Sequence, residues 1–427
     1  MSRDSKKRIK WDKLDNTANL FPVIVSENVS NVYRISATLV EEIDRDVLQQ
    51  ALDEVLPFFD VFNSRMKKGL FWYYFETNLN DPPRVEEENK YPCEYINPFD
   101  NRDYLFRVSF YKRRINLEVF HVLTDGNGAL MFLKELVYQY LRLRHTELAD
   151  KKQGILNIGT SLDKEDSYVK NYKKAAKKEY NTKKAFIIRG QRFQTPQFGI
   201  MHGYVNLQDI KRVSKKYGVT INQYLIGLFA WAVYEEYMSH SDSDVPFSAC
   251  VPVNLRPYFN SDTNKNFFAI VSAVFKPTKD SYTFEEVLGE IKISLDSQIN
   301  KEHLEKLFSY NVSNEKNKAI RAVPLFIKNI AMRSVYKSSA RANTTTVTNL
   351  GVINVDEKYQ KYIERFHVIL SMSKGQNIKG GVCSYKDTLV FTFSAAIKET
   401  FVQKCFFRKM VEDGINVSIE TNGAYYE

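Results

Sequence analysis

Residues 115–141 read INLEVFHVLTDGNGALMFLKELVYQYL, and this stretch decides the fold. Every second residue from Ile115 onward is apolar until His121 continues the same face, which is typical of a strand with one buried side. The turn signal Thr-Asp-Gly follows at 124–126, and apolar residues three or four positions apart then predict a helix over 128–143. We therefore expect His121 to point inward at a strand–loop–helix junction, where a cleft can open.

The same mixture of strands and helices continues on both sides of this stretch. Thr220 with Gln223, and Thr283 with Glu286, have the spacing of capping boxes and mark the starts of two helices. The alternation of strands and helices in both halves predicts α/β (α+β) sandwich lobes rather than a helix bundle or a barrel. The expected strands are 31–40, 70–77, 104–112, 115–122, 246–255, 266–275, 344–351, 366–372 and 387–396, and the expected helices are 44–59, 128–143, 220–238, 283–299 and 399–414.

The length of the chain bounds its domain organisation. At 427 residues it is longer than one hydrophobic core usually spans. We predict two similar lobes, an N-terminal lobe over 1–180 and a C-terminal lobe over 181–427. The Lys-rich stretch 151–184 holds few large apolar residues, which predicts a solvated crossover between the lobes. A direct role of this stretch in holding a phosphate is the alternative.

The formal charge of +10 first suggests a nucleic-acid partner. Basic residues occur all along the chain, however, and it has no zinc-finger, RNP or arginine-rich motif. A positive field suits an anionic cofactor that carries phosphates equally well. We therefore expect no nucleic-acid partner.

The cysteines and the apolar runs bear on the compartment. The four cysteines form no C-x-x-C pair, and the basic start of the chain is followed by no apolar segment typical of a signal peptide. The longest apolar run, Tyr224 to Tyr234, is shorter than the roughly 20 residues that a membrane span needs. We expect a cytoplasmic, reduced protein without a membrane span. The histidines other than His121 lack metal-ligand spacing, so no metal is expected.

His121, Asp125 and Gly126 form the motif H-x-x-x-D-G. A neutral imidazole whose pKa lies near the working pH can act as a general base. A buried histidine that is satisfied by hydrogen bonds is the plain alternative. The motif by itself leaves both interpretations open.

An H-x-x-x-D-G motif after a strand resembles that of the coenzyme-A-dependent acyltransferase superfamily. This superfamily includes chloramphenicol acetyltransferase, the plant BAHD acyltransferases, wax-ester synthases and the condensation domains of nonribosomal peptide synthetases. Phe120 stands where condensation domains usually carry a further histidine, so the chain departs from that subgroup. Four more stretches resemble the superfamily in order, and are closest to its bacterial alcohol acetyltransferase-like branch: WDKLDNTANLFP (11–22), VPVNLRPYF (251–259), TNKNFFAIVSAVF (263–275) and VTNLGVI (347–353).

The resemblance implies two chloramphenicol-acetyltransferase-like lobes with a channel between them, reached by acyl-CoA from one face and by the acceptor from the other. His121 would take the proton of a hydroxyl or amine that attacks the thioester, without a covalent acyl-enzyme. Asp125 would pair with an arginine rather than relay protons, and Arg256 is the candidate partner. A surface arginine before a proline turn is the alternative for Arg256. Gly126 would let the loop pass close to the substrate and could offer its N–H to the oxyanion.

Asn266 and Asn349 complete the set of candidate site residues, as residues that line the channel. For Asn349 a plain turn after a strand fits equally well. We expect an acyl-CoA-dependent acyltransferase that acts on a small alcohol or amine. The alternatives are a free-standing condensation-type enzyme that uses carrier-protein thioesters, and a non-enzymatic binding or regulatory protein.

Overall fold

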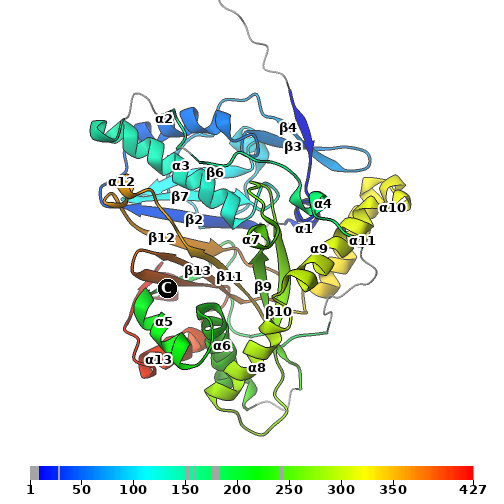
Figure 1. Ribbon diagram of the computed structural model, residues 1–427, viewed down its shortest axis with the longest axis vertical. Helices are drawn as coiled ribbons and strands as arrows, with labels where there is room; N and C mark the ends of the chain where they lie inside the picture. Colours follow the sequence, from blue (N-terminus) through cyan, green and yellow to red (C-terminus); the bar gives the residue numbers. More distant parts are fainter. Residues whose placement is uncertain are drawn as a thin grey trace, which may run out of the picture.

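The computed structural model describes residues 9–26, 29–149, 154–157, 159–174, 183–240 and 244–426. Over these ranges the chain forms a five-stranded and a seven-stranded sheet, with a three-stranded sheet near its start (Figure 1). The described residues form two hydrophobic clusters, one around each large sheet, and the first also includes side chains of the seven-stranded sheet. The two-lobed α/β sandwich predicted from the sequence is confirmed.

The five-stranded sheet forms the core of the first lobe, with α2 (Arg45–Val55) and α3 (Gly126–Arg144) packed together beside it. Asp44 and Asp125 cap these two helices by accepting hydrogen bonds from first-turn amides. The strand order is β12 (Ile363–Leu370), β2 (Val32–Leu39), β7 (Arg114–Phe120), β6 (Phe106–Tyr111) and β5 (Glu86–Glu87). Because β12 comes from the second half of the chain, the lobes share a strand across the boundary predicted at residue 180.

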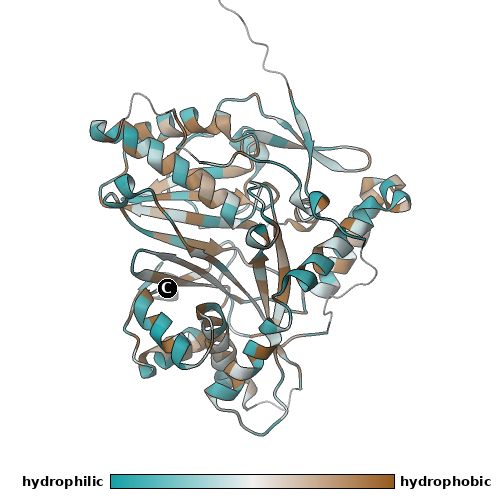
Figure 2. Cartoon of the chain, viewed as in Figure 1, coloured by the Kyte–Doolittle hydropathy of each residue, from teal (hydrophilic) through white to brown (hydrophobic). Residues whose placement is uncertain are grey.

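The seven-stranded sheet forms the second lobe. Hydrophobic residues run along its central strands, whereas α5 is mostly hydrophilic (Figure 2). Its strand order is β10 (Phe268–Phe275), β9 (Phe247–Asn254), β11 (Thr345–Val352), β13 (Ile378–Tyr385), β14 (Thr388–Ala395), β8 (Gly199–Asn206) and β15 (Val417–Thr421), and its helices are α5 (Leu207–Lys216), α6 (Ile221–Val233), α8 (Phe284–Asp296) and α13 (Phe401–Glu412). Both predicted capping boxes are present, at the starts of α6 and α8.

Shorter elements surround the junction of the lobes. The three-stranded sheet has the order β1 (Trp11–Lys13), β4 (Tyr73–Thr77) and β3 (Ser64–Lys68). Helices α9 (Lys301–Lys316), α10 (Lys318–Ala322) and α11 (Leu325–Ser339) lie along one side of the molecule (Figure 1). The remaining helices are α1 (Phe21–Ile24), α4 (Ser167–Lys170), α7 (Arg256–Phe259) and α12 (Glu357–Gln360).

Some elements differ from expectation. The elements β8, β13, α5, α9 and α11 were not predicted. In β13 all eight positions are buried, so the strand shows no alternation of polar and apolar residues. A Cβ on Gly381 would lie 2.6 Å from Val368 O of β12, so the missing side chain lets the two sheets approach closely. The turn between β6 and β7 lies at Lys112–Arg113, one residue earlier than the gap between the predicted strands 104–112 and 115–122.

The Lys-rich stretch 151–184 is described in part, because residues 151–153, 158 and 175–182 lie outside the described ranges. In the described part, Tyr168 of α4 is 2% exposed. Its hydroxyl donates a hydrogen bond to Phe268 O at 2.7 Å. At α4 the stretch is therefore anchored to the second lobe, while most of its other described residues are exposed or half-buried. The solvated crossover stays a prediction.

Candidate active site

His121 follows β7 directly, and its backbone N–H donates to Asn31 O at 3.0 Å. The half-buried imidazole stacks on Phe21 of α1, with 4.5 Å between ring centroids, and meets the ring of Tyr33 edge-on at 4.9 Å. Burial lowers the pKa of His121, although a hydrogen bond to its own backbone and the charge of Asp125 oppose this effect. The imidazole is therefore neutral at neutral pH.

A chain of hydrogen bonds fixes the tautomer of His121. Asn266 Nδ2 donates to Asp15 Oδ2 at 2.8 Å, and Asn266 Oδ1 lies 3.2 Å from His121 Nδ1. Because the amide nitrogen is directed at the carboxylate, the amide oxygen faces the imidazole. An amide oxygen can only accept, so Nδ1 carries the hydrogen. Nε2 therefore keeps its lone pair, as a general base requires.

Asp15 is the last residue in this series of hydrogen bonds, and only 2% of its surface is exposed. Burial raises the pKa of Asp15 to about 7, against the hydrogen bonds from Asn266 and from Ala18 N. The ionised carboxylate accepts from both donors. Protonation of Oδ2 would present an O–H donor to Asn266 instead, so the ionisation of Asp15 is coupled to the orientation of the amide.

Asp125 and Arg256 form a two-pronged ion pair, with Nη1–Oδ2 at 2.8 Å and Nη2–Oδ1 at 3.1 Å. Asp125 also accepts from the backbone amides of Phe267, Asn127 and Gly128. Burial alone raises the pKa of Asp125, but the Arg256 guanidinium and the amides outweigh it and hold that pKa below its usual value. The structure thus brings together the two residues that the sequence paired.

Two glycines determine how closely the loop after His121 is packed. A Cβ on Gly126 would lie 2.6 Å from the side chain of Leu350. A Cβ on Gly128 would lie 2.0 Å from Thr124 Oγ1 and 2.5 Å from the backbone oxygen of Asn264. Gly128, which the sequence did not single out, is the more restricted of the two because a backbone atom cannot easily move away.

Asn349 lies half-buried at a bulge in β11. Its Oδ1 accepts a hydrogen bond from Gly351 N–H at 2.7 Å, and Gly351 has a φ of +74°. The side chain thus stabilises a turn that a glycine must occupy. Its position on a channel wall stays a prediction.

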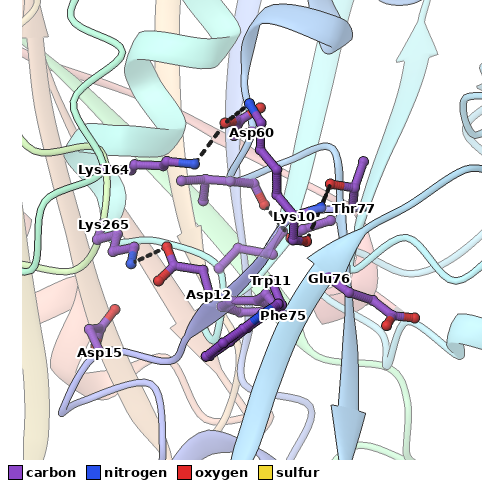
Figure 3. Close-up of a pocket in the computed structure, with 13 residues that line it drawn as sticks. Lys10, Trp11, Asp12, Asp15, Asp60, Phe75, Glu76, Thr77, Lys164 and Lys265 are labelled. Carbon is purple, nitrogen blue, oxygen red and sulfur yellow. Dashed lines mark hydrogen bonds and ion pairs between the residues drawn. The ribbon is translucent and has the colours of Figure 1, made fainter. Parts of the chain in front are cut away.

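Two pockets lie near the site, between different sets of loops, and His121 lines neither of them. Asp15 and Leu123 line the first, together with the Lys265–Asp12 and Lys164–Asp60 ion pairs (Figure 3). The second, of about 370 Å³, lies between the loops at 92–95, 192–198 and 371–372 and includes Ser30, which precedes the Asn31 carbonyl that binds His121 N–H.

The four cysteines and Lys379 are further candidates for a reactive side chain. Burial raises the pKa of each of the four cysteine thiols, so none of them is an activated nucleophile. Burial lowers the pKa of Lys379 to about 8, and its Nζ donates to Ser371 O and Ser373 Oγ. Among the described residues, no three His, Cys, Asp or Glu side chains converge as a set of metal ligands.

Comparison with known proteins places the fold. No family model and no curated protein sequence matches the chain. Among solved structures, F. sporotrichioides TRI101 complexed with coenzyme A and T-2 is similar at a TM-score of 0.63 and 11% identity, over 96% of this chain and 99% of that one. The first condensation domain of the calcium-dependent antibiotic synthetase has a TM-score of 0.61 and 11% identity, over 95% and 96%. TRI3, a trichothecene 15-O-acetyltransferase from Fusarium sporotrichioides, has 0.56 and 13%, over 97% of both chains.

These similarities extend over nearly the whole length of both partners. The chain therefore has the two-lobed fold that acyltransferases and condensation domains share, as its sequence motifs predicted. No helix among the described residues has both the length and the apolar character that crossing a bilayer demands.

Proposed function

We propose that this protein is an acyltransferase that moves an acyl group from a coenzyme A thioester to the hydroxyl or amine of a small acceptor. The observation that carries the proposal is the state of His121: burial lowers its pKa and so favours the neutral imidazole, and Asn266 holds its Nδ1. Asp15, the next residue along the same hydrogen bonds, lines a pocket. The fold supports it, because structures that share this fold include a coenzyme A complex and an O-acetyltransferase.

In the proposed reaction, Nε2 of His121 removes the proton of the acceptor hydroxyl as its oxygen attacks the thioester carbonyl. The tetrahedral intermediate then breaks its C–S bond. The proton on Nε2 passes to the departing thiolate, which leaves the ester and free coenzyme A. The pockets at Asp15 and at Ser30 would be the two mouths of the channel. The N–H of Gly126 would face the oxyanion, because the amides of Asn127 and Gly128 already donate to Asp125.

Asp125 and Arg256 have a structural role in this proposal. Asp125 is engaged by Arg256 and backbone amides, and it caps α3. It therefore holds the loop that carries His121 against the second lobe. Asn266 and Asp15 are positioning residues, because they act on the substrate only through the tautomer of His121.

The test is a thiol-release assay with short and long acyl-CoAs and pools of alcohols and amines. His121→Ala should stay folded and lose about 10²–10⁴-fold in rate. His240→Ala, which changes an exposed histidine, should keep the wild-type rate. A His121→Ala enzyme that works at the wild-type rate would refute the proposed base.

Asn266→Leu separates positioning from folding. It removes the acceptor that fixes Nδ1, so we expect kcat to fall roughly 10- to 100-fold while KM for the thioester changes little. An unchanged kcat would show that Asn266 does not position the base.

The same assay with an acylated carrier protein as donor distinguishes a condensation-type enzyme, which would turn over that donor and not acyl-CoA.

A further inference from the structure

Residues 316–341 form a basic segment that includes α10 and α11. The segment contains four lysines, three arginines and no aspartate or glutamate, so it carries a formal charge of +7 against +10 for the whole chain. The rest of the chain therefore has a net charge of only 10 − 7 = +3, so most of the net positive charge is concentrated in this segment. Burial and the charge of Arg321 lower the pKa of Lys328, as expected where like charges crowd together.

The same segment exposes large apolar side chains. Phe326, Ile327 and Ile330 of α11, which we call the α11 strip, are 60%, 45% and 66% exposed. At 100° per residue these three positions fall within one third of the helix circumference. The opposite face is formed by Leu325, which is buried, and Met332, which packs against the core of the first lobe.

The basic side chains flank this strip. On the helix, Arg333 and Lys337 lie at one edge of the strip, whereas Lys328 lies about 100° beyond the other edge, toward the buried face. Lys328 Nζ donates to Phe71 O, and Arg333 Nε donates to Val23 O. Carbonyl groups hold these side chains without neutralising their charge.

A hairpin loop extends the apolar surface beyond α11. Leu325 N donates to Leu70 O at 2.8 Å, which joins the β3–β4 loop to the start of α11. Leu70 is 70% exposed, and Trp72 in the same loop is also exposed, with Lys13 over its ring. Contiguous apolar patches of this kind mark interaction sites, and tryptophan beside basic residues is typical of membrane interfaces.

We propose that the α11 strip, with Leu70 and Trp72, docks onto the surface of an anionic phospholipid bilayer without crossing it. The apolar side chains would enter the headgroup region while Lys328, Arg333 and Lys337 meet lipid phosphates. A second copy of the chain fits less well, because a two-fold interface would place two segments of charge +7 against each other.

The docking surface adjoins the candidate active site. α11 contacts α1, and Phe21 of α1 stacks on His121. Docking would therefore bring a bilayer close to Phe21, which contacts the imidazole. The proposal does not depend on acyl transfer, and its test measures lipid binding alone.

The experiment is flotation of the full chain with vesicles of phosphatidylcholine alone or with one-third phosphatidylserine. We expect binding to the anionic vesicles only, and weaker binding in high salt. Phe326→Ser/Ile330→Ser should lose binding while keeping its melting temperature, since both side chains are exposed. The matched control is Ile293→Ser/Val411→Ser, which changes two exposed residues on α8 and α13 and should bind normally.

Charge is tested separately. Each basic residue at an anionic surface strengthens binding by roughly fivefold, so Lys328→Gln/Arg333→Gln/Lys337→Gln should weaken it on the order of 100-fold. Lys211→Gln/Lys215→Gln/Lys404→Gln, at exposed positions on α5 and α13, is the control. The proposal is overturned if the wild type ignores anionic vesicles, if the strip variants float like the wild type, or if their only change is conversion of a dimer to a monomer.

Discussion

Replacing Arg256 with methionine tests whether the Asp125–Arg256 pair fixes the loop after His121. The substitution leaves Asp125, which is 5% exposed, without its counter-charge, and it removes the donors to Thr263 O and Lys265 O. Loss of one partner from a buried ion pair costs about 3–5 kcal/mol. We expect Arg256→Met to lower the free energy of unfolding by that amount.

Urea unfolding, followed by tryptophan fluorescence and circular dichroism together, measures this change. The double variant Asp125→Asn/Arg256→Met removes both charges, so its loss should be smaller than the sum of the single losses by about 1–3 kcal/mol. Arg212→Met is the control, because Arg212 pairs with Asp209 at the surface and should contribute less than about 1 kcal/mol.

The pH dependence of the free energy of unfolding tests the same ion pair. Arg256 holds the pKa of Asp125 below its unfolded value of about 3.9, so the stabilisation is complete above that pH. It is lost as the pH falls toward the lower, folded pKa. The gap between wild type and Arg256→Met should therefore narrow below about pH 4. A gap under 1 kcal/mol at pH 7, with additive single losses, would contradict the proposed role of the pair.

Two further predictions concern the pH profile and the loop glycine. For the wild type, kcat/KM should rise through the ionisation of Asp15, whose pKa burial raises to about 7. In Asp15→Asn this limb should vanish, leaving a lower plateau whose acid side follows the pKa of His121, which burial lowers. Identical profiles for the two proteins would disprove the coupling. Gly128→Ala should destabilise the fold by about 1–3 kcal/mol because its Cβ meets a backbone oxygen. Gly289→Ala, where the new Cβ meets open space on α8, should instead stabilise the fold by about 0.5–1 kcal/mol. If urea unfolding shows that both variants lose the same stability, the clash at Gly128 is not the cause.

The part of the fold around His121 could be predicted because local patterns encode it. Period-two alternation marks β7, and Asp125 supplies both the turn and the cap of α3. β13 and α11 lack such patterns. β13 is buried on both faces around Gly380 and Gly381, and α11 is apolar on its inward and outward faces, so neither shows one clear stripe.

Only those residues of the candidate site that belong to a recognisable sequence motif could be predicted. His121 and Asp125 belong to one local motif, and Arg256 came from the resemblance. Asp15 lies 251 positions from Asn266, and Asn266 lies 145 positions from His121. Nothing local in either stretch indicates that these side chains meet, because the contact exists only once the two lobes have packed together.

One segment of the second lobe, residues 254–268, controls most of the geometry of the imidazole. Arg256 and Phe267 N hold Asp125, Asn266 sets the tautomer of His121, and the Asn264 carbonyl accepts from Thr124 Oγ1. His121 lies in the first lobe, but the second lobe, through Asn266, determines which ring nitrogen carries its hydrogen. A movement of the lobes that broke these contacts would let the imidazole change its tautomer and would free the loop after His121 at the same time. Catalytic competence should therefore depend on the packing of the lobes as strongly as on the histidine itself.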